Sequence, residues 1–264
     1  MRTGSWLSAA TVLALILAAC DGDKTWGAGQ PPVGGGNHGG STGETEADAE
    51  VPPIGDDGGA APAVSGVVCE VVDVRFPGNC TPVGRADLVV GIEDTTGSPL
   101  DTTMTLAGGA FSMPKPTVDT VWLTISDPMH IYHFGAQVVP IQVMGASGVA
   151  VPVIKNGYYD SIIAASMAIQ NTGNGVVMLH LEHGDTPLAN AVLGPLRGAT
   201  AYYDRMGDSV TFSTQTPTTT TGFAVWFDVP PALNANYNVT VGGVITPHVG
   251  SAYADAVTFL SDVN

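Results

Sequence analysis

Basic residues are scarce in this sequence. Its 264 residues include eight Lys and Arg against 24 Asp and Glu, which gives a formal net charge of −16 at pH 7. Nucleic acids and anionic lipid headgroups are bound mainly through clustered positive charge. A chain with this balance is attracted to neither, and we interpret its acidic surface as a contribution to solubility.

Familiar catalytic motifs are missing as well. The sequence has no Gly-x-Ser-x-Gly, no His-Glu-x-x-His and no Gly-rich phosphate loop with a Lys. The segment "GDSV" at 207–210 resembles the nucleophile block of one hydrolase family, but here it lies late in the chain, with no Asp-x-x-His after it. We interpret it as a turn. We therefore expect a protein that is not an enzyme and has no cofactor, with a hydrolase as the less favoured alternative.

The N-terminus has the features of an export signal. Arg2 precedes an apolar run from Ala9 to Ala19, which ends in Leu17-Ala18-Ala19-Cys20. This ending resembles the lipobox of bacterial lipoproteins, which implies a signal peptide over residues 1–20, cleavage just before Cys20, and acylation of that cysteine with fatty acids such as palmitate. The alternatives are an ordinary cleavage site or a transmembrane helix, although the run is short for a membrane span.

Residues 21–63 have a different composition. They are rich in Gly, Pro and acidic residues, with eight acids against one Lys and few large apolar side chains. Such a segment cannot bury a core and is expected to be a disordered tether. Its r.m.s. reach is roughly 35–40 Å on Gly-rich chain statistics, so the folded part would stand clear of a membrane. Cation binding by its acids is the alternative.

From residue 64 onward the pattern is that of short β-strands. Apolar and polar residues alternate between turn residues, as in "NYNVTV", where Tyr237, Val239 and Val241 fall on one face. Within "AFSMP" and "WFDVP" an apolar pair runs into a Pro, which marks the turn between two strands. The sequence therefore predicts an all-β protein.

The strand pattern occurs twice in the sequence. The segments "AFSMPKPTVDTVWLTI" at 110–125 and "WFDVPPALNANYNVTV" at 226–241 align without a gap, so that Phe111 matches Phe227 and Leu123 matches Val239. The segments "TPVGRA" at 81–86 and "TPLANA" at 186–191 also correspond. We expect two similar β-sandwich domains, residues 64–155 and 175–264, each close to the size of a seven-stranded sandwich. Each should unfold by itself, unless the segment between them joins the two cores.

The order of these pieces resembles the carboxypeptidase regulatory-like family of transthyretin-like β-sandwiches. Residues 175–241 carry the resemblance best, and residues 66–125 match more loosely. Gly222 stands five residues before Phe227, whereas Gly109 stands two before Phe111, which leaves the strand registers open. The resemblance implies two tandem transthyretin-like or Ig-like sandwiches. It also implies non-catalytic accessory or cell-envelope modules.

Residues 156–174 lie between the two predicted domains. Apolar residues from Ile162 to Ile169 indicate one short helix that begins near Asp160 or Ser161 and ends before Gly173, with a strand as the alternative. We expect this connector to place its apolar side between the sandwiches.

Three cysteines are present. With Cys20 assigned to the lipid, Cys69 and Cys80 remain, and an even remainder in an exported chain predicts a disulfide. Their Cα atoms should then lie within about 7 Å. Two unbonded thiols are the alternative.

Two His-x-x-His pairs resemble the halves of a metal site. Both pairs lie in segments predicted to be strands and turns, where this spacing does not suit metal binding. His130 and His133, and His180 and His183, would share a face on a helix but point to opposite sides of a strand. We expect His180 on the solvent-exposed face, His183 facing inward or at a turn, and no metal site.

Two adjacent tyrosine pairs are candidates for ligand binding. In an extended segment, one ring of Tyr158 and Tyr159, and one of Tyr202 and Tyr203, must face away from the core, where it could contact a sugar or a protein. Half-buried sheet residues or an interface between the sandwiches are the alternative.

Taken together, these features predict a lipid-anchored bacterial protein, exported to the periplasmic side of a membrane or to the cell surface. We expect it to be a binding or structural module of the cell envelope with a protein or glycan partner. A carbohydrate-binding module is the alternative.

Overall fold

The computed structural model describes residues 63–84, 86–140, 146–184, 186–204, 208–215 and 217–263. The predicted signal peptide, Cys20 and the tether up to residue 62 lie outside the described residues. The described chain consists mainly of β-strands with a single α-helix, which confirms the all-β class. No helix in these ranges is long and apolar enough to span a membrane.

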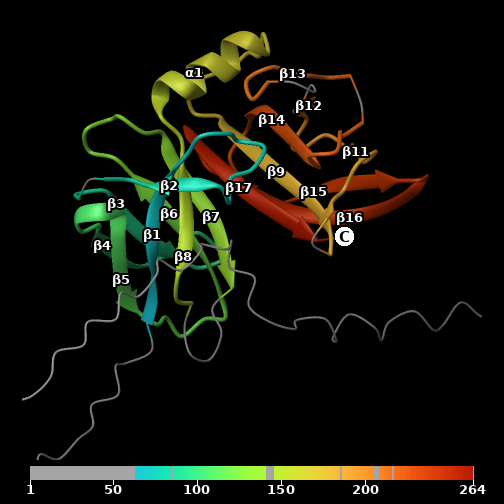
Figure 1. The fold of residues 1–264 in the computed structure, drawn as a ribbon. Helices are drawn as coiled ribbons and strands as arrows, with labels where there is room; N and C mark the ends of the chain where they lie inside the picture. The colour runs from blue at the N-terminus through green and yellow to red at the C-terminus, as the bar shows by residue number, and fades with distance from the viewer. Residues whose placement is uncertain are drawn as a thin grey trace, which may run out of the picture.

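The strands fall into two halves along the chain (Figure 1). The first half contains β1 (Ala63–Val71), β2 (Cys80–Pro82), β3 (Val89–Glu93), β4 (Pro99–Met104), the 3-10 turn η1 (Ala107–Gly109), β5 (Ala110–Pro114), β6 (Thr120–Ser126), β7 (Phe134–Pro140) and β8 (Val149–Val153). The second half follows the helix α1 (Asn156–Ala165) and contains β9 (Gly175–His183), β10 (Thr186–Pro187), β11 (Val192–Leu193), β12 (Ala201–Asp204), β13 (Phe212–Ser213), β14 (Phe223–Val229), β15 (Ala232–Val241), β16 (Val244–Ala252) and β17 (Ala256–Val263).

The first strand of each half has the same kinds of neighbour. β1 pairs antiparallel with β5 and β2 along one edge and parallel with β8 along the other. In the second half, β9 pairs antiparallel with β14 and β10 and parallel with β17. Three of the remaining strands in each half also correspond, since the antiparallel order β3-β6-β7 in the first half matches β11-β15-β16 in the second.

Two glycines fix the correspondence between the halves. Gly109 and Gly222 both have positive φ, +77° and +64°, and stand directly before β5 and β14. A Cβ atom added to Gly109 would lie 2.6 Å from the carbonyl oxygen of Val68, and one added to Gly222 would lie 2.4 Å from that of Leu181. Glycine is needed at both positions because of the backbone conformation and the close approach of the first strand.

This correspondence corrects the register inferred from the sequence. Two residues after Gly109 comes Phe111, but two residues after Gly222 comes Ala224. The sequence match with Phe227 is therefore displaced by three residues, an odd number, which turns the side chain to the other face of the strand. Phe111 and Phe227 are both 4% exposed but belong to different hydrophobic clusters, so the predicted equivalence is wrong.

The other predicted match is confirmed. Leu123 pairs with Ile92 of β3 in the first half, and Val239 pairs with Leu193 of β11 in the second. Leu123 and Val239 are both completely buried in the core of their own half.

One sheet of ten strands runs through both halves. Its order is β13-β12-β14-β9-β17-β7-β6-β3-β4, with β10 paired to β9. β17 connects the halves, because it pairs in parallel with β9 from Val257 to Val263 and with β7 from Ala256 to Phe259. In Figure 1 the long red β17 lies beside the yellow β9 and the green β7. The two predicted domains are therefore joined edge to edge by backbone hydrogen bonds.

Three hydrophobic cores fill the structure. The first core lies within the first half, and the second core lies within the second half together with Trp122 of β6. The third core contains Val71, Val74, Ile154, Tyr159, Ile162, Val176, Met178, Phe212, Phe223, Val225, Phe227, Val257 and Phe259. Residues of β1, the loop after it, α1 and the second half meet there, so the two halves share apolar surface.

The connecting segment forms the expected helix, but its bounds differ from the prediction. α1 begins at Asn156, four residues before Asp160, and ends at Ala165. Tyr159 and Ile162 face the third core, whereas Met167 and Ile169 lie beyond the helix and are 88% and 75% exposed. Met167 has a φ of +50°, which ends the helical course before the apolar run is complete.

The shared third core predicts cooperative unfolding. Phe227→Ala should lower the free energy of unfolding by about 3–5 kcal/mol, because it removes a buried ring. Since the third core joins the halves, chemical denaturation followed by Trp fluorescence and limited proteolysis should show one transition. Phe111→Ala in the first core is the matched control and should also give one transition. A protease-resistant fragment of residues 64–155 that outlasts the second half would contradict this coupling.

Candidate binding surfaces

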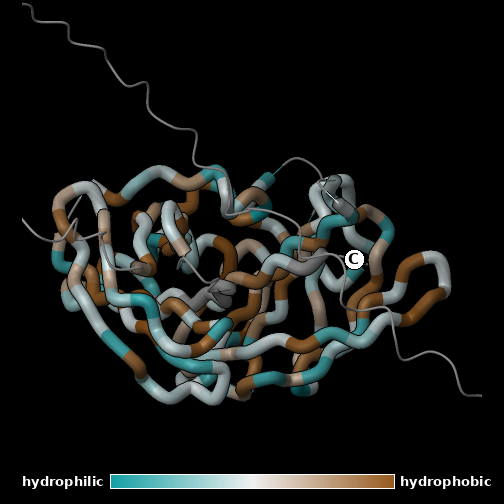
Figure 2. Tube along the Cα trace, turned by 90° about the horizontal axis from the view of Figure 1, so that it is seen from below, coloured by the Kyte–Doolittle hydropathy of each residue, from teal (hydrophilic) through white to brown (hydrophobic). Residues whose placement is uncertain are grey.

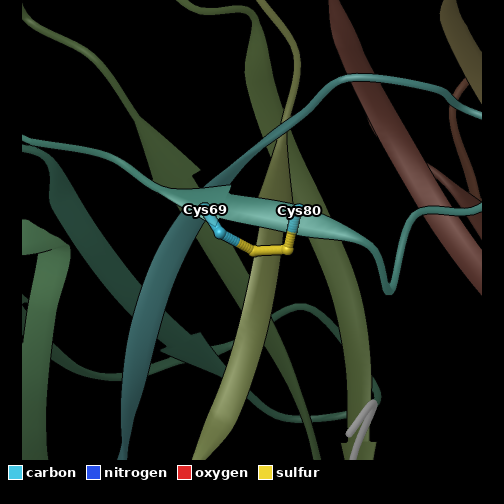
Figure 3. The surroundings of a disulfide bond; sticks show 2 residues. All are labelled: Cys69 and Cys80. Atoms are coloured by element: carbon cyan, nitrogen blue, oxygen red, sulfur yellow. A yellow bond between two sulfur atoms is a disulfide. The ribbon is translucent and has the colours of Figure 1, made fainter. Parts of the chain in front are cut away.

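The predicted disulfide between Cys69 and Cys80 is present. The two Cα atoms are 5.3 Å apart, and the bond connects β1 to β2 (Figure 3). It closes the loop of residues 70–79, in which Val74 is completely buried in the third core. The bond therefore restrains the loop that brings a first-half side chain into the surface shared by both halves.

Tyr158 links the same loop to the second half. Its hydroxyl accepts a hydrogen bond from the Val74 backbone N–H (3.3 Å) and donates one to the Ser209 carbonyl oxygen (3.0 Å). Burial is the main cause that raises the pKa of this hydroxyl, so it remains protonated and able to donate. Ser166, just after α1, adds a second link, because its hydroxyl donates to Val210 O and accepts from Phe212 N–H.

The segment resembling a hydrolase block is a turn, as predicted, in the residues that are described. The Asp208 carboxylate accepts hydrogen bonds from the backbone N–H groups of Val210 and Thr211, at 3.0 and 2.6 Å. These bonds, that of Thr211 first, lower the pKa of Asp208. Ser209 uses its carbonyl oxygen to accept the bond from Tyr158. Both residues therefore have structural roles here.

Arg75 lies in the loop after β1 and places a positive charge near the surface that the two halves share. Its guanidinium forms an ion pair with Asp73 at 2.6 Å. The pKa of Arg75 is raised, first by the hydrogen bond to Asp73 and to a lesser extent by the negative charge of Asp204 in the second half. A cation from the first half thus lies among carboxylates of both halves in a chain that has few cations.

The four candidate tyrosines do not form one binding face. Tyr158 and Tyr159 pack in or against the third core, and the Tyr159 ring lies 3.8 Å from the His133 ring, centroid to centroid. Tyr203 is 1% exposed in the second core, where its hydroxyl accepts a hydrogen bond from Leu193 N–H. Tyr202 points to the opposite face of β12, packs edge-on against Phe227 and is half-buried.

Tyr202 lines an open hollow of about 480 Å³. The hollow is lined by Met167, Ile169, Asn174, Arg197, Gly198, Ala199, Thr200, Tyr202, Phe227, Asp228 and Pro230. It thus combines apolar side chains, a tyrosine ring, a guanidinium and a carboxylate, which are groups that can bind an amphipathic ligand. Sequence reasoning found Tyr202 but missed the others, because they come from separate segments.

Asp228 is held firmly at the edge of this hollow. It lies in a β-bulge of β14 with a φ of +56°. Its carboxylate accepts hydrogen bonds from the backbone N–H and side-chain amide of Asn171 and from the side-chain amide of Asn174, each at 2.8 Å. The Asn171 backbone bond is the largest cause that lowers the pKa of Asp228, so the carboxylate stays ionised at neutral pH.

The histidines occupy separate environments. His130 is exposed in the bend after β6, His183 is exposed at the end of β9, where it pairs with Thr186 of β10, and His133 is half-buried. His180 is only 5% exposed, so its predicted position on a solvent-exposed face is wrong. The strand β9 lies inside the ten-stranded sheet, with the second core on one face and the third core on the other. Across the described ranges, no group of three or more His, Cys, Asp or Glu side chains could hold a metal ion.

Comparisons with known proteins give distant structural likenesses. No family model matches the chain, and no curated protein matches it. The Bacillus anthracis TIE protein is 14% identical, with a TM-score of 0.23 over 76% of this chain and 34% of that one. The minor pilin GBS52 of Streptococcus agalactiae is 9% identical, with a TM-score of 0.23 over 76% and 95% of the two chains. A fimbrial protein from Bacteroides ovatus is 7% identical, with a TM-score of 0.21 over 77% and 51%. The chain spans about a third of the TIE protein's length.

The disulfide loop predicts a measurable stabilisation. Replacing Cys69 and Cys80 together by Ser should lower the free energy of unfolding by about 2–3 kcal/mol, because an open loop gains freedom in the unfolded chain. It should also speed proteolysis within residues 72–79, the part that carries Val74. Equilibrium denaturation and mapping of the cleavage sites measure both effects. Two titratable thiols in the native protein would contradict the bond.

The buried histidines predict a loss of stability in mild acid. Burial is the first cause that lowers the pKa of His133 and His180 from the ordinary 6.5. The folded state therefore takes up protons less readily than the unfolded chain, and stability present above pH 6.5 should fall as the pH drops toward the lowered pKa values. Denaturation curves between pH 7.5 and 5 measure this slope.

The matched variants for this test are His133→Gln and His180→Gln. Each should reduce the slope of stability against pH between these limits, even if it lowers stability at pH 7.5. His183→Gln, at the exposed end of β9, is the control for the substitution itself. A slope that stays the same in both buried variants would show that these imidazoles are not its source.

Proposed function

We propose that this protein is a lipid-anchored, non-catalytic module of the bacterial cell envelope or cell surface. In this proposal Cys20 carries the lipid, residues 21–63 are a disordered acidic tether, and the two halves are tandem transthyretin-like sandwiches. The observation that carries the proposal is the sequence Leu17-Ala18-Ala19-Cys20 at the end of an apolar signal, followed by a segment unable to fold. The disulfide supports export, because such bonds persist in oxidising compartments.

The repeated strand pairing supports the tandem architecture. Each half begins with a strand that pairs antiparallel with the strand after a positive-φ glycine and parallel with the last strand of that half. Each half also has its own core. We therefore place residues 64–155 and 175–264 in two sandwiches, with residues 156–174 as the connector.

The joined halves suit a structural or binding role outside the membrane. The pairing of β17 with β7, the third core and the Tyr158 hydrogen bonds all act between the halves. They would let the folded part present one fixed surface at the end of the tether, to an envelope protein or a glycan.

Carbohydrate binding is a second candidate, favoured by the hollow beside Tyr202. The ring there can contact the apolar face of a sugar, while Arg197 can donate hydrogen bonds to its hydroxyls and the Asp228 carboxylate can accept them. In this case the protein would still be a lipid-anchored module without catalysis. Crosslinking in the intact envelope, followed by identification of the attached molecule, distinguishes a protein partner from a glycan.

The anchor is tested by Cys20→Ser. The variant should leave the membrane fraction or accumulate as uncleaved precursor, because the thiol that accepts the lipid is gone. Cell fractionation and mass spectrometry of the N-terminal peptide measure both outcomes. Cys80→Ser is the matched control, since it removes a cysteine but leaves the anchor, and it should stay in the membrane fraction. A normally cleaved Cys20→Ser protein that remains on the membrane would overturn the lipoprotein assignment.

A further inference from the structure

The edge of β16 that faces away from β15 corresponds to the edge of β7 that pairs with β17. In the first half, Leu123 pairs with Gln137 of β7, and in the second half Val239 pairs with Thr246 of β16. By this register, residues 134–137 of β7 correspond to residues 243–246, which are Gly243 of the turn and the first three residues of β16. Residues 134–137 are the ones that pair with β17. Among the strands that the structure describes, only β15 pairs with the corresponding residues of β16.

Apolar side chains are exposed along this edge. Val244, Ile245 and Val249 are 68%, 64% and 57% exposed. The β15–β16 hairpin projects from the body of the fold (Figure 1), and the projecting loop on the same side of Figure 2 has hydrophobic colouring at its tip. An exposed, apolar edge strand favours pairing with another strand.

Charge is absent from the same region. Residues 230–254 contain no Asp, Glu, Lys or Arg, although the whole chain has a net charge of −16. Edge strands are commonly protected from association by charged side chains, and this one has none. Two copies of an acidic chain repel each other over most of their surfaces, whereas an uncharged edge lets them approach without that cost.

Pro247 limits how far such pairing can extend. Proline has no N–H to donate and is tolerated on an edge strand when its nitrogen faces away from the sheet. The corresponding residue of β7 is Val138, one position beyond the last residue that pairs with β17. The residues before Pro247 are therefore the ones free to form a ladder, and they centre on Ile245.

We propose that a second copy of this chain docks on the β16 edge, so that two β16 strands pair antiparallel around a two-fold axis near Ile245. The same residues of each copy then form the two sides of the contact, as in any two-fold symmetric interface. Val244 lies opposite Thr246 of the other copy, and the two Ile245 side chains lie next to each other. In this pairing the exposed Val244 and Ile245 of each copy contact side chains of the other copy. The inference does not depend on the lipid or on either candidate function.

The test compares two exposed apolar positions. Ile245→Lys places two like charges at the axis and should weaken self-association of the full chain by about tenfold or more. Sedimentation equilibrium in density-matched detergent measures the dissociation constant. Leu106→Lys is the matched control, because Leu106 is 70% exposed in the first half and away from β16. It should leave the dissociation constant unchanged.

Crosslinking locates the contact. Ile245→Cys, treated with a short bis-maleimide in intact membranes, should give a crosslinked dimer, whereas Leu106→Cys should not. A chain that stays monomeric at all concentrations would overturn the proposal. So would self-association that Ile245→Lys leaves unchanged. Crosslinking of Ile245→Cys to a different protein would also overturn it, because the edge would then belong to that partner.

Discussion

The parallel pairing of β17 with both β9 and β7 determines how the two halves of this protein sit against each other. Backbone hydrogen bonds set the spacing of neighbouring strands, whatever their side chains are. With β17 shared, the sheet of the second half continues into a sheet of the first. The third core, the Tyr158 hydrogen bonds and the position of Arg75 all depend on this junction, because they require the loop after β1 to reach α1 and β13.

Much of the local pattern could be predicted from the sequence. The strand alternation, the helix in the connector, the Cys69–Cys80 bond and the match of Leu123 with Val239 all depend on residues close together or on a direct repeat. The register of Phe227 could not be predicted in this way. Aligning the aromatic residues gave one register, but the close approach of Gly109 and Gly222 to the first strands set another. The register is therefore set by the positions where only glycine fits, and not by the similarity of the aromatic side chains.

The environment of His180 was misjudged for a related reason. Alternation predicts one solvent-exposed face, but β9 is an inner strand covered on both faces. The apolar run from Val176 to Leu179 was a signal of that two-sided burial. The hollow beside Tyr202 had no comparable signal, because Met167, Arg197 and Asp228 come together only after the turn following α1 and the bulge in β14 are formed.

The position of β1 has a mechanical consequence. It is the first described strand, and it is paired along both edges, with β5 and β2 on one side and β8 on the other. A force applied through the N-terminal end of β1 therefore acts along the strand axis, across hydrogen bonds that lie roughly perpendicular to it. Such a load is shared by many bonds at once, whereas peeling an edge strand breaks them one at a time. Such a force loads β1 in shear, the geometry in which its pairing with neighbouring strands resists force best.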